Sequence, residues 1–124
     1  MGGNMERIKF INHKGAEILL LDFSNCTVQE LYPLFVQAKA VITAQPRGSV
    51  LTLTDVTNAQ VNDTITQQVK TYTIQNKPFV KASAVVGALG MLKVILGTVE
   101  FASKREFREF ETLEQAKDWL AEQK

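Results

Sequence analysis

The feature that most limits the possible folds is the alternation of short apolar segments with longer helical ones along the chain. Two strand-like segments flank "KG" at 14–15 and predict a hairpin. The predicted strands are 7–13, 16–23, 49–55, 79–88 and 106–110. Strands and helices that alternate through short connections form a mainly parallel sheet covered by helices. The sequence therefore predicts an α/β fold of order ββαβαβαβα, in which a mixed, mainly parallel five-stranded sheet carries four helices.

Two of the four helices have clear start signals. Thr27 with Glu30 has the spacing of a capping box, and so has Thr112 with Gln115. The first helix runs to about residue 44 and contains Pro33, which either kinks the helix or is its first residue, so that the true start lies near it. The second helix spans about 62–76, and the third lies in 87–102.

Length and composition narrow the class of protein. A chain of 124 residues with 45% hydrophobic and 22% charged residues fits one globular domain over 1–124, with 1–5 expected to be disordered. The net charge of +1 argues against a nucleic-acid partner. The single cysteine, Cys26, cannot form an internal disulfide, and no apolar run near the start resembles a signal peptide. We therefore expect a cytoplasmic protein without cofactors.

The stretch "GALGMLKVILGTVEFA" at 87–102 has more apolar side chains than one sheet face can bury. One face holds Leu89, Leu92, Leu96 and Val99, and we expect this face to dock. The surplus face holds Met91, Val94, Ile95 and Phe101. The run is too short and too interrupted to cross a membrane, so no integral membrane segment is expected. The surplus face then covers the last helix near Trp119 and Leu120, a second copy, or a lipid-like ligand. The predicted homodimer would use the surplus face.

The carboxyl ends of the parallel strands are the usual place for a ligand. Asp55 with Gly87, Gly90 and Lys93 forms a candidate anion-binding turn, where the third helix offers its first amides. In the alternative interpretation, Asp22 and Asp55 accept hydrogen bonds from turn amides and the glycines make a tight turn. "GALGMLK" matches neither the dinucleotide fingerprint nor the P-loop.

No catalytic or metal-binding motif stands out. His13 is the only histidine and belongs to the first predicted strand or its turn. Cys26 precedes a helix, where a thiolate is favoured, but nothing in the sequence brings His13 beside it. We therefore expect no catalytic residues, no metal site and no enzymatic activity.

The strand order and the segments "SVLTLTDVTNA", "NKPFVKASAVVG" and "FETLEQAKDWLAEQ" resemble a group of bacterial proteins of unknown function in the SpoIIAA-like superfamily. These proteins have the STAS (sulfate transporter and anti-sigma factor antagonist) fold, which is distantly similar to CRAL-TRIO lipid-transfer domains. The resemblance covers the chain from about Arg7 and implies a STAS-like domain.

The resemblance also implies a regulatory site. In anti-sigma factor antagonists a Ser or Thr that follows an Asp is phosphorylated, which switches partner binding, and the match here is Thr64 after Asp63. Ile65 and Thr66 depart from the small residues of the family at the following positions. Similarity to CRAL-TRIO domains implies a lipid pocket instead. The predicted function is thus a non-enzymatic regulatory or protein-binding domain with a possible regulatory partner, and the alternative is a carrier or sensor of a small hydrophobic ligand.

Overall fold

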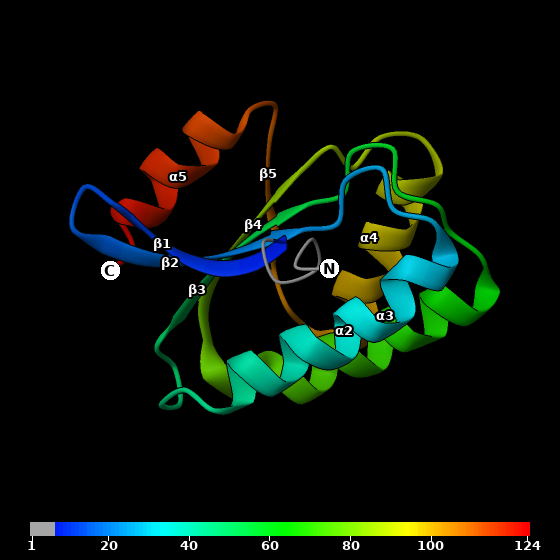
Figure 1. Cartoon of the computed structure of the whole chain (residues 1–124), viewed down its shortest axis with the longest axis horizontal. Helices are drawn as coiled ribbons and strands as arrows, with labels where there is room; N and C mark the ends of the chain where they lie inside the picture. The colour runs from blue at the N-terminus through cyan, green and yellow to red at the C-terminus, as the bar shows by residue number, and fades with distance from the viewer. Residues whose placement is uncertain (1–6) are drawn as a thin grey trace.

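The computed structural model of the chain describes residues 7–124 (Figure 1). The disorder expected for 1–5 lies outside the described residues. In chain order the elements are β1 (Ile8–His13), β2 (Ala16–Asp22), α2 (Val28–Thr43), β3 (Val50–Asp55), α3 (Asp63–Asn76), the 3-10 turn η1 (Lys77–Phe79), β4 (Val80–Val86), α4 (Met91–Ser103), β5 (Arg108–Phe110) and α5 (Leu113–Ala121).

The five strands of the described chain form one mixed sheet in the order β1-β2-β3-β4-β5. β1 pairs with β2 antiparallel at one edge, and every later pair is parallel. Asp22 lies beside Asp55, which lies beside Val86 on the next strand, so three strand ends meet in register. The predicted α/β class, the mixed five-stranded sheet and the four helices are confirmed.

The helices divide unequally between the two faces of the sheet. Figure 1 shows α2, α3 and α4 on one face and α5 on the other. Because consecutive parallel strands are neighbours in space, right-handed crossovers place each connecting helix on the same face. α4 therefore packs against α3, and of the three alternatives for the surplus face of 87–102, the contact with the last helix is wrong.

Two apolar clusters fill the two sides of the sheet, because successive side chains of a strand point in opposite directions. On β2, Leu19 and Leu21 contribute to the cluster that contains α2 and part of α3. Ile18 contributes to the other cluster, in which Ala116 and Leu120 of α5 are fully buried.

The local helix signals are largely as the sequence predicts. Both capping boxes are present, on Thr27 with Glu30 and on Thr112 with Gln115. α2 begins at Val28 with Pro33 inside it, so the alternative start near Pro33 is wrong. The capping box fixes the earlier start, and only the helical bond to the Gln29 carbonyl loses its donor. α4, in contrast, begins after Gly90, which provides no side-chain cap.

Candidate functional site

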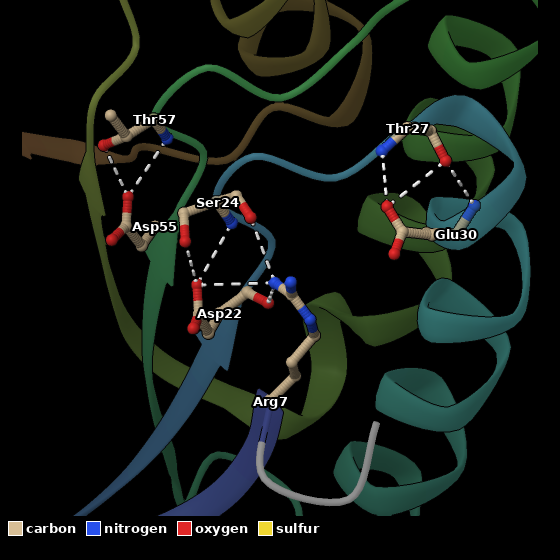
Figure 2. Close-up of polar contacts among 7 residues, drawn as sticks. All are labelled: Arg7, Asp22, Ser24, Thr27, Glu30, Asp55 and Thr57. Atoms are coloured by element: carbon tan, nitrogen blue, oxygen red, sulfur yellow. Dashed lines mark hydrogen bonds and ion pairs between the residues drawn. The ribbon is translucent and has the colours of Figure 1, made fainter. Parts of the chain in front are cut away.

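Two similar turns follow β2 and β3 at the carboxyl edge of the sheet (Figure 2). Asp22 Oδ1 accepts hydrogen bonds from the Ser24 amide, at 3.0 Å, and from the Ser24 hydroxyl. Asp55 Oδ1 accepts from the Thr57 amide at 3.0 Å and from Thr57 Oγ1 at 2.7 Å. Each carboxylate thus stabilises its own turn, as the alternative interpretation predicted.

The main chain joins the two turns to each other. The Phe23 amide donates to the Asp55 carbonyl at 2.9 Å, and the Asn25 amide donates to the Thr57 carbonyl at 2.8 Å. Asn25 and Asn58 both have φ of 58°, a left-handed conformation that asparagine tolerates well. The signal for this pairing, which sequence reasoning missed, is the repeat of Asp, an apolar residue, Ser or Thr, and Asn in "DFSN" and "DVTN".

The residues of the predicted anion-binding turn are divided between two places. Gly87 lies against Thr57: it has φ of 87°, and a Cβ there would lie 2.6 Å from the Thr57 amide nitrogen. Gly90, with φ of 58°, precedes α4. Lys93 Nζ forms an ion pair with Glu109 Oε1 at 2.8 Å. Asp55 and Gly87 therefore meet around Thr57, and Lys93 is directed toward β5.

The predicted phosphoacceptor lies in the first turn of α3. Thr64 and Asp63 are both exposed, and the next residue, Ile65, is buried. Asn62 caps the helix, since its Oδ1 accepts from the Ile65 amide at 2.7 Å. Thr64 is accessible at a helix N-terminus, where added negative charge is favourable.

The two most reactive side-chain types lie far apart. His13 is the last residue of β1 and lies next to the start of β2, and its Nε2 is 2.7 Å from Asp118 Oδ1 of α5. Cys26 follows the end of β2, so the length of this strand separates the two by roughly 20 Å. Cys26 is buried, and burial raises the pKa of its thiol. The arrangement therefore does not bring His13 to this cysteine.

The predicted interface residues of α4 are mostly at the surface. Met91, Val94 and Phe101 are 64%, 63% and 88% exposed, but Ile95 is half-buried. Leu89, which we expected to dock, is 77% exposed. It lies ahead of the helix start, and its position therefore does not follow the helical spacing.

A cavity of about 110 Å³ lies beneath α4 on the α2–α3 side of the sheet. Its walls are almost wholly apolar and come from Phe23 after β2, from β3 and β4 with the loops that follow them, from α2, α3 and α4, and from Phe107 before β5. Leu92, Ile95 and Leu96 of α4 line it, which explains why these three are only half-buried although they point inward.

Comparison with known proteins gives no match: no family model, no curated protein and no solved structure matches this chain. The resemblance to STAS domains therefore stays a prediction. None of the helices in residues 7–124 has both the length and the apolar character needed to cross a bilayer. The same residues contain no group of three His, Cys, Asp or Glu side chains placed to hold a metal ion.

Proposed function

We propose that this protein is a non-enzymatic, STAS-like binding module that pairs with a second copy of itself through the outward face of α4. The observation that carries the proposal is the apolar surface of this helix. Of the seven exposed large hydrophobic residues in the described chain, Leu89, Met91, Val94 and Phe101 belong to α4 or the loop before it. Clustered exposed apolar side chains are typical of interaction sites.

The spacing of the exposed residues favours a helix as the partner. Met91, Val94, Thr98 and Phe101 repeat at intervals of three, four and three, which is the pattern of a helix–helix seam. Thr98 Oγ1 donates to the Val94 carbonyl at 3.1 Å. Because its hydroxyl is bonded within its own helix, Thr98 leaves its methyl group for an apolar partner.

The same seam is complementary to itself. In an antiparallel pair related by a two-fold axis, Met91 of one copy lies opposite Phe101 of the other, a favourable sulfur–aromatic contact that occurs twice. Gly97 lies beside the seam, and a Cβ added there would meet no atom within 4 Å, so a second helix can approach closely. The net charge of +1 gives two copies little reason to repel each other.

The expected dimer is weak. A standard interface buries about 800 Å² on each partner, and one helix of 13 residues supplies less. We expect a dissociation constant on the order of 10 µM or weaker.

Sedimentation equilibrium over a range of protein concentrations tests the proposal. The wild type should dimerise, and Val94→Glu should be monomeric with an unchanged circular dichroism spectrum, because pairing would bury each new carboxylate in an apolar seam without a partner charge. Val36→Glu on α2 is the matched control, since Val36 is 65% exposed and Val94 is 63% exposed. A wild type that stays monomeric at high concentration, or a control that dissociates equally, would overturn the pairing.

Regulation at Thr64 belongs to the same proposal. The exposure of Thr64 and its place at the start of α3 support a phosphoacceptor role, since phosphate adds about −1.5 to −2 charges near a surface that meets a partner. Phosphopeptide mass spectrometry of the protein purified from its own cells tests this role. Absence of phosphate at Thr64 under all growth conditions would count against it.

The cavity beneath α4 favours a second candidate, a carrier or sensor of a small apolar ligand. Its volume of about 110 Å³ is well below the roughly 300–1,000 Å³ of typical ligand pockets, so it suits a ring-sized molecule better than an acyl chain. Native mass spectrometry of the protein from its own cells separates the two candidates. A dimer without adduct supports pairing, and a monomer with an apolar adduct supports the carrier.

A further inference from the structure

A polar hollow of about 350 Å³ lies at the open edge of β4, apart from the cavity beneath α4. β5 pairs with β4 only over Ala84–Val86, so the preceding residues Lys81–Ser83 have no strand on that side within the described chain. The walls are completed by the segment 104–106 after α4, by Trp119 of α5 and by Gln123, which follows α5. We call this site the edge hollow.

The edge hollow concentrates positive charge. Lys77, Lys81, Lys104 and Arg105 line it against one acidic residue, Glu106. These five charges sum to +3, whereas the whole chain carries +1. None of the four cations takes part in an ion pair among residues 7–124, although Arg7, Lys14, Lys93 and Lys117 all do.

Arg105 is the fixed centre of this charge. Its guanidinium donates to the Thr73 carbonyl at 3.1 Å and to Ser83 Oγ at 2.6 Å, and it stacks on Phe107 at 4.6 Å. Burial lowers its pKa to about 10, so it stays charged at neutral pH. A desolvated arginine is normally paired with an acid. Here only two of its five N–H donors are bonded to neutral oxygens, which leaves donors for an anion.

Lys104 adds a second unusual feature. It ends α4 with φ of 56°, in the left-handed position where glycine is the usual residue. Lys77 Nζ lies 3.4 Å from the Ser103 carbonyl and 3.3 Å from that of Lys104, which holds this corner in place. Lysine at a glycine-favoured position is consistent with a use for its charge.

We propose that the edge hollow binds a small phosphate-bearing anion, a phosphomonoester or a diphosphate. Arginine recognises phosphate with its planar fork, and lysines add point charges. A net charge of +3 favours a multiply charged group over a single carboxylate, and the volume lies within the range of small-ligand sites. Lysines on a strand edge also prevent the edge from pairing with another strand. That role alone does not explain why Arg105 is half-buried without an acidic partner.

Fluorescence of Trp119 provides a direct test, because it is the only tryptophan of the chain and lines the edge hollow. Inorganic phosphate and pyrophosphate are titrated at constant ionic strength against sodium chloride. We expect saturation, with a dissociation constant for pyrophosphate on the order of 0.1 mM and weaker binding of phosphate. Lys81→Gln should weaken pyrophosphate binding about threefold, and Lys93→Gln should not change it.

Lys104→Gly separates binding from structure. Glycine relieves the left-handed conformation, so this variant should unfold at a higher temperature and yet bind pyrophosphate about threefold more weakly. Lys14→Gly is the matched control, since Lys14 is also left-handed, with φ of 52°, and is not among the residues that line the edge hollow. It should bind pyrophosphate like the wild type.

Three results would overturn the proposal: a response that fails to saturate, one that chloride reproduces, or unchanged affinity in both Lys81→Gln and Lys104→Gly. Binding of an acidic extended peptide without any response to pyrophosphate would equally overturn it, in favour of strand addition at the β4 edge. Arg105→Gln would not separate binding from folding, because Arg105 also joins α3 to β4.

Discussion

α5 and α4 make the most instructive comparison in the molecule. α5 has nine residues, a capping box, and contacts with all five strands. α4 has 13 residues and a more apolar composition, but only Val99 and Ser103 are buried, and it packs mainly against α3. The more hydrophobic helix is thus the less completely docked one. The apolar content of a helix sets how much surface it could bury. The area of sheet beneath the helix decides how much of that surface the fold does bury.

The reason lies in the shape of the sheet. α5 crosses the side where Ile18, Leu53 and Ala84 of three adjacent strands present a continuous apolar surface. α4 connects β4 to β5, and β5 is only three residues long. Because the strand is short, a cavity remains between α4 and the sheet, and a stripe of apolar residues on the outward face of α4 stays exposed. Both candidate functions of this helix follow from that shortfall.

A matched pair of leucine truncations should break or support the comparison with the largest effect. Leu120 of α5 is fully buried, and Leu89 before α4 is 77% exposed. Leu120→Ala should lower the free energy of unfolding by about 3 kcal/mol, and Leu89→Ala by less than about 0.5 kcal/mol. Urea denaturation followed by circular dichroism measures both. Equal losses would mean that the region around Leu89 is as firmly docked as α5.

Two alanine-to-valine substitutions test the packing on each side. Ala88 lines the cavity beneath α4, whereas Ala116 is completely buried in α5. Ala88→Val should raise the free energy of unfolding by up to about 1 kcal/mol, because its methyl groups enter empty space. Ala116→Val should lower it by about 1–3 kcal/mol through overpacking and reduced helix propensity. Similar losses in thermal and urea unfolding would show that the cavity has no room for two methyl groups.

Local signals explain why much of the fold is predictable from the sequence. The capping boxes mark two helix starts, and the weak alternation in 79–88 indicates an interior parallel strand, which is β4. Those signals depend on neighbouring residues. Which side of the sheet holds the last helix depends on the order of strands in space. The sequence pattern therefore left open a contact between α4 and α5 that the topology does not make.

The candidate sites are less predictable for a similar reason. The surplus face of 87–102 is visible in the sequence as a stripe, and three of its four residues are exposed. The edge hollow was missed because its cations come from η1, β4 and the segment after α4, and no spacing along the chain marks them. A short last strand, "EFREF", was the one hint that an edge of β4 stays open.

Replacing Gly97 sharpens the comparison from the side of α4. Gly97 lies inside the helix, and a Cβ there would meet no atom within 4 Å. Gly97→Ala should therefore raise the free energy of unfolding by about 0.5–1 kcal/mol, since alanine loses less backbone entropy in a helix. Urea denaturation at low protein concentration, where monomer dominates, measures this gain. A loss of stability would mean that α4 packs against a surface at Gly97.

The smallest expected effect concerns how α5 is held by charge. Asp118 contacts His13 at 2.7 Å and Lys14 at 2.9 Å, which joins α5 to the β1–β2 hairpin. The hydrogen bond with His13, followed by that with Lys14, lowers the pKa of Asp118 below its ordinary value of 3.8. A carboxylate with a lowered pKa in the folded state stabilises that state above its unfolded pKa and loses this contribution as the pH falls through the folded value.

Asp118→Asn should therefore be slightly less stable than the wild type at pH 6, with the difference vanishing in strong acid, as thermal unfolding across the pH range would measure. A difference in stability that persists at the lowest pH would mean that packing and neutral hydrogen bonds at Asp118, and not its charge, hold α5. α5 would then differ from α4, which an ion pair between Lys93 and Glu109 joins to β5.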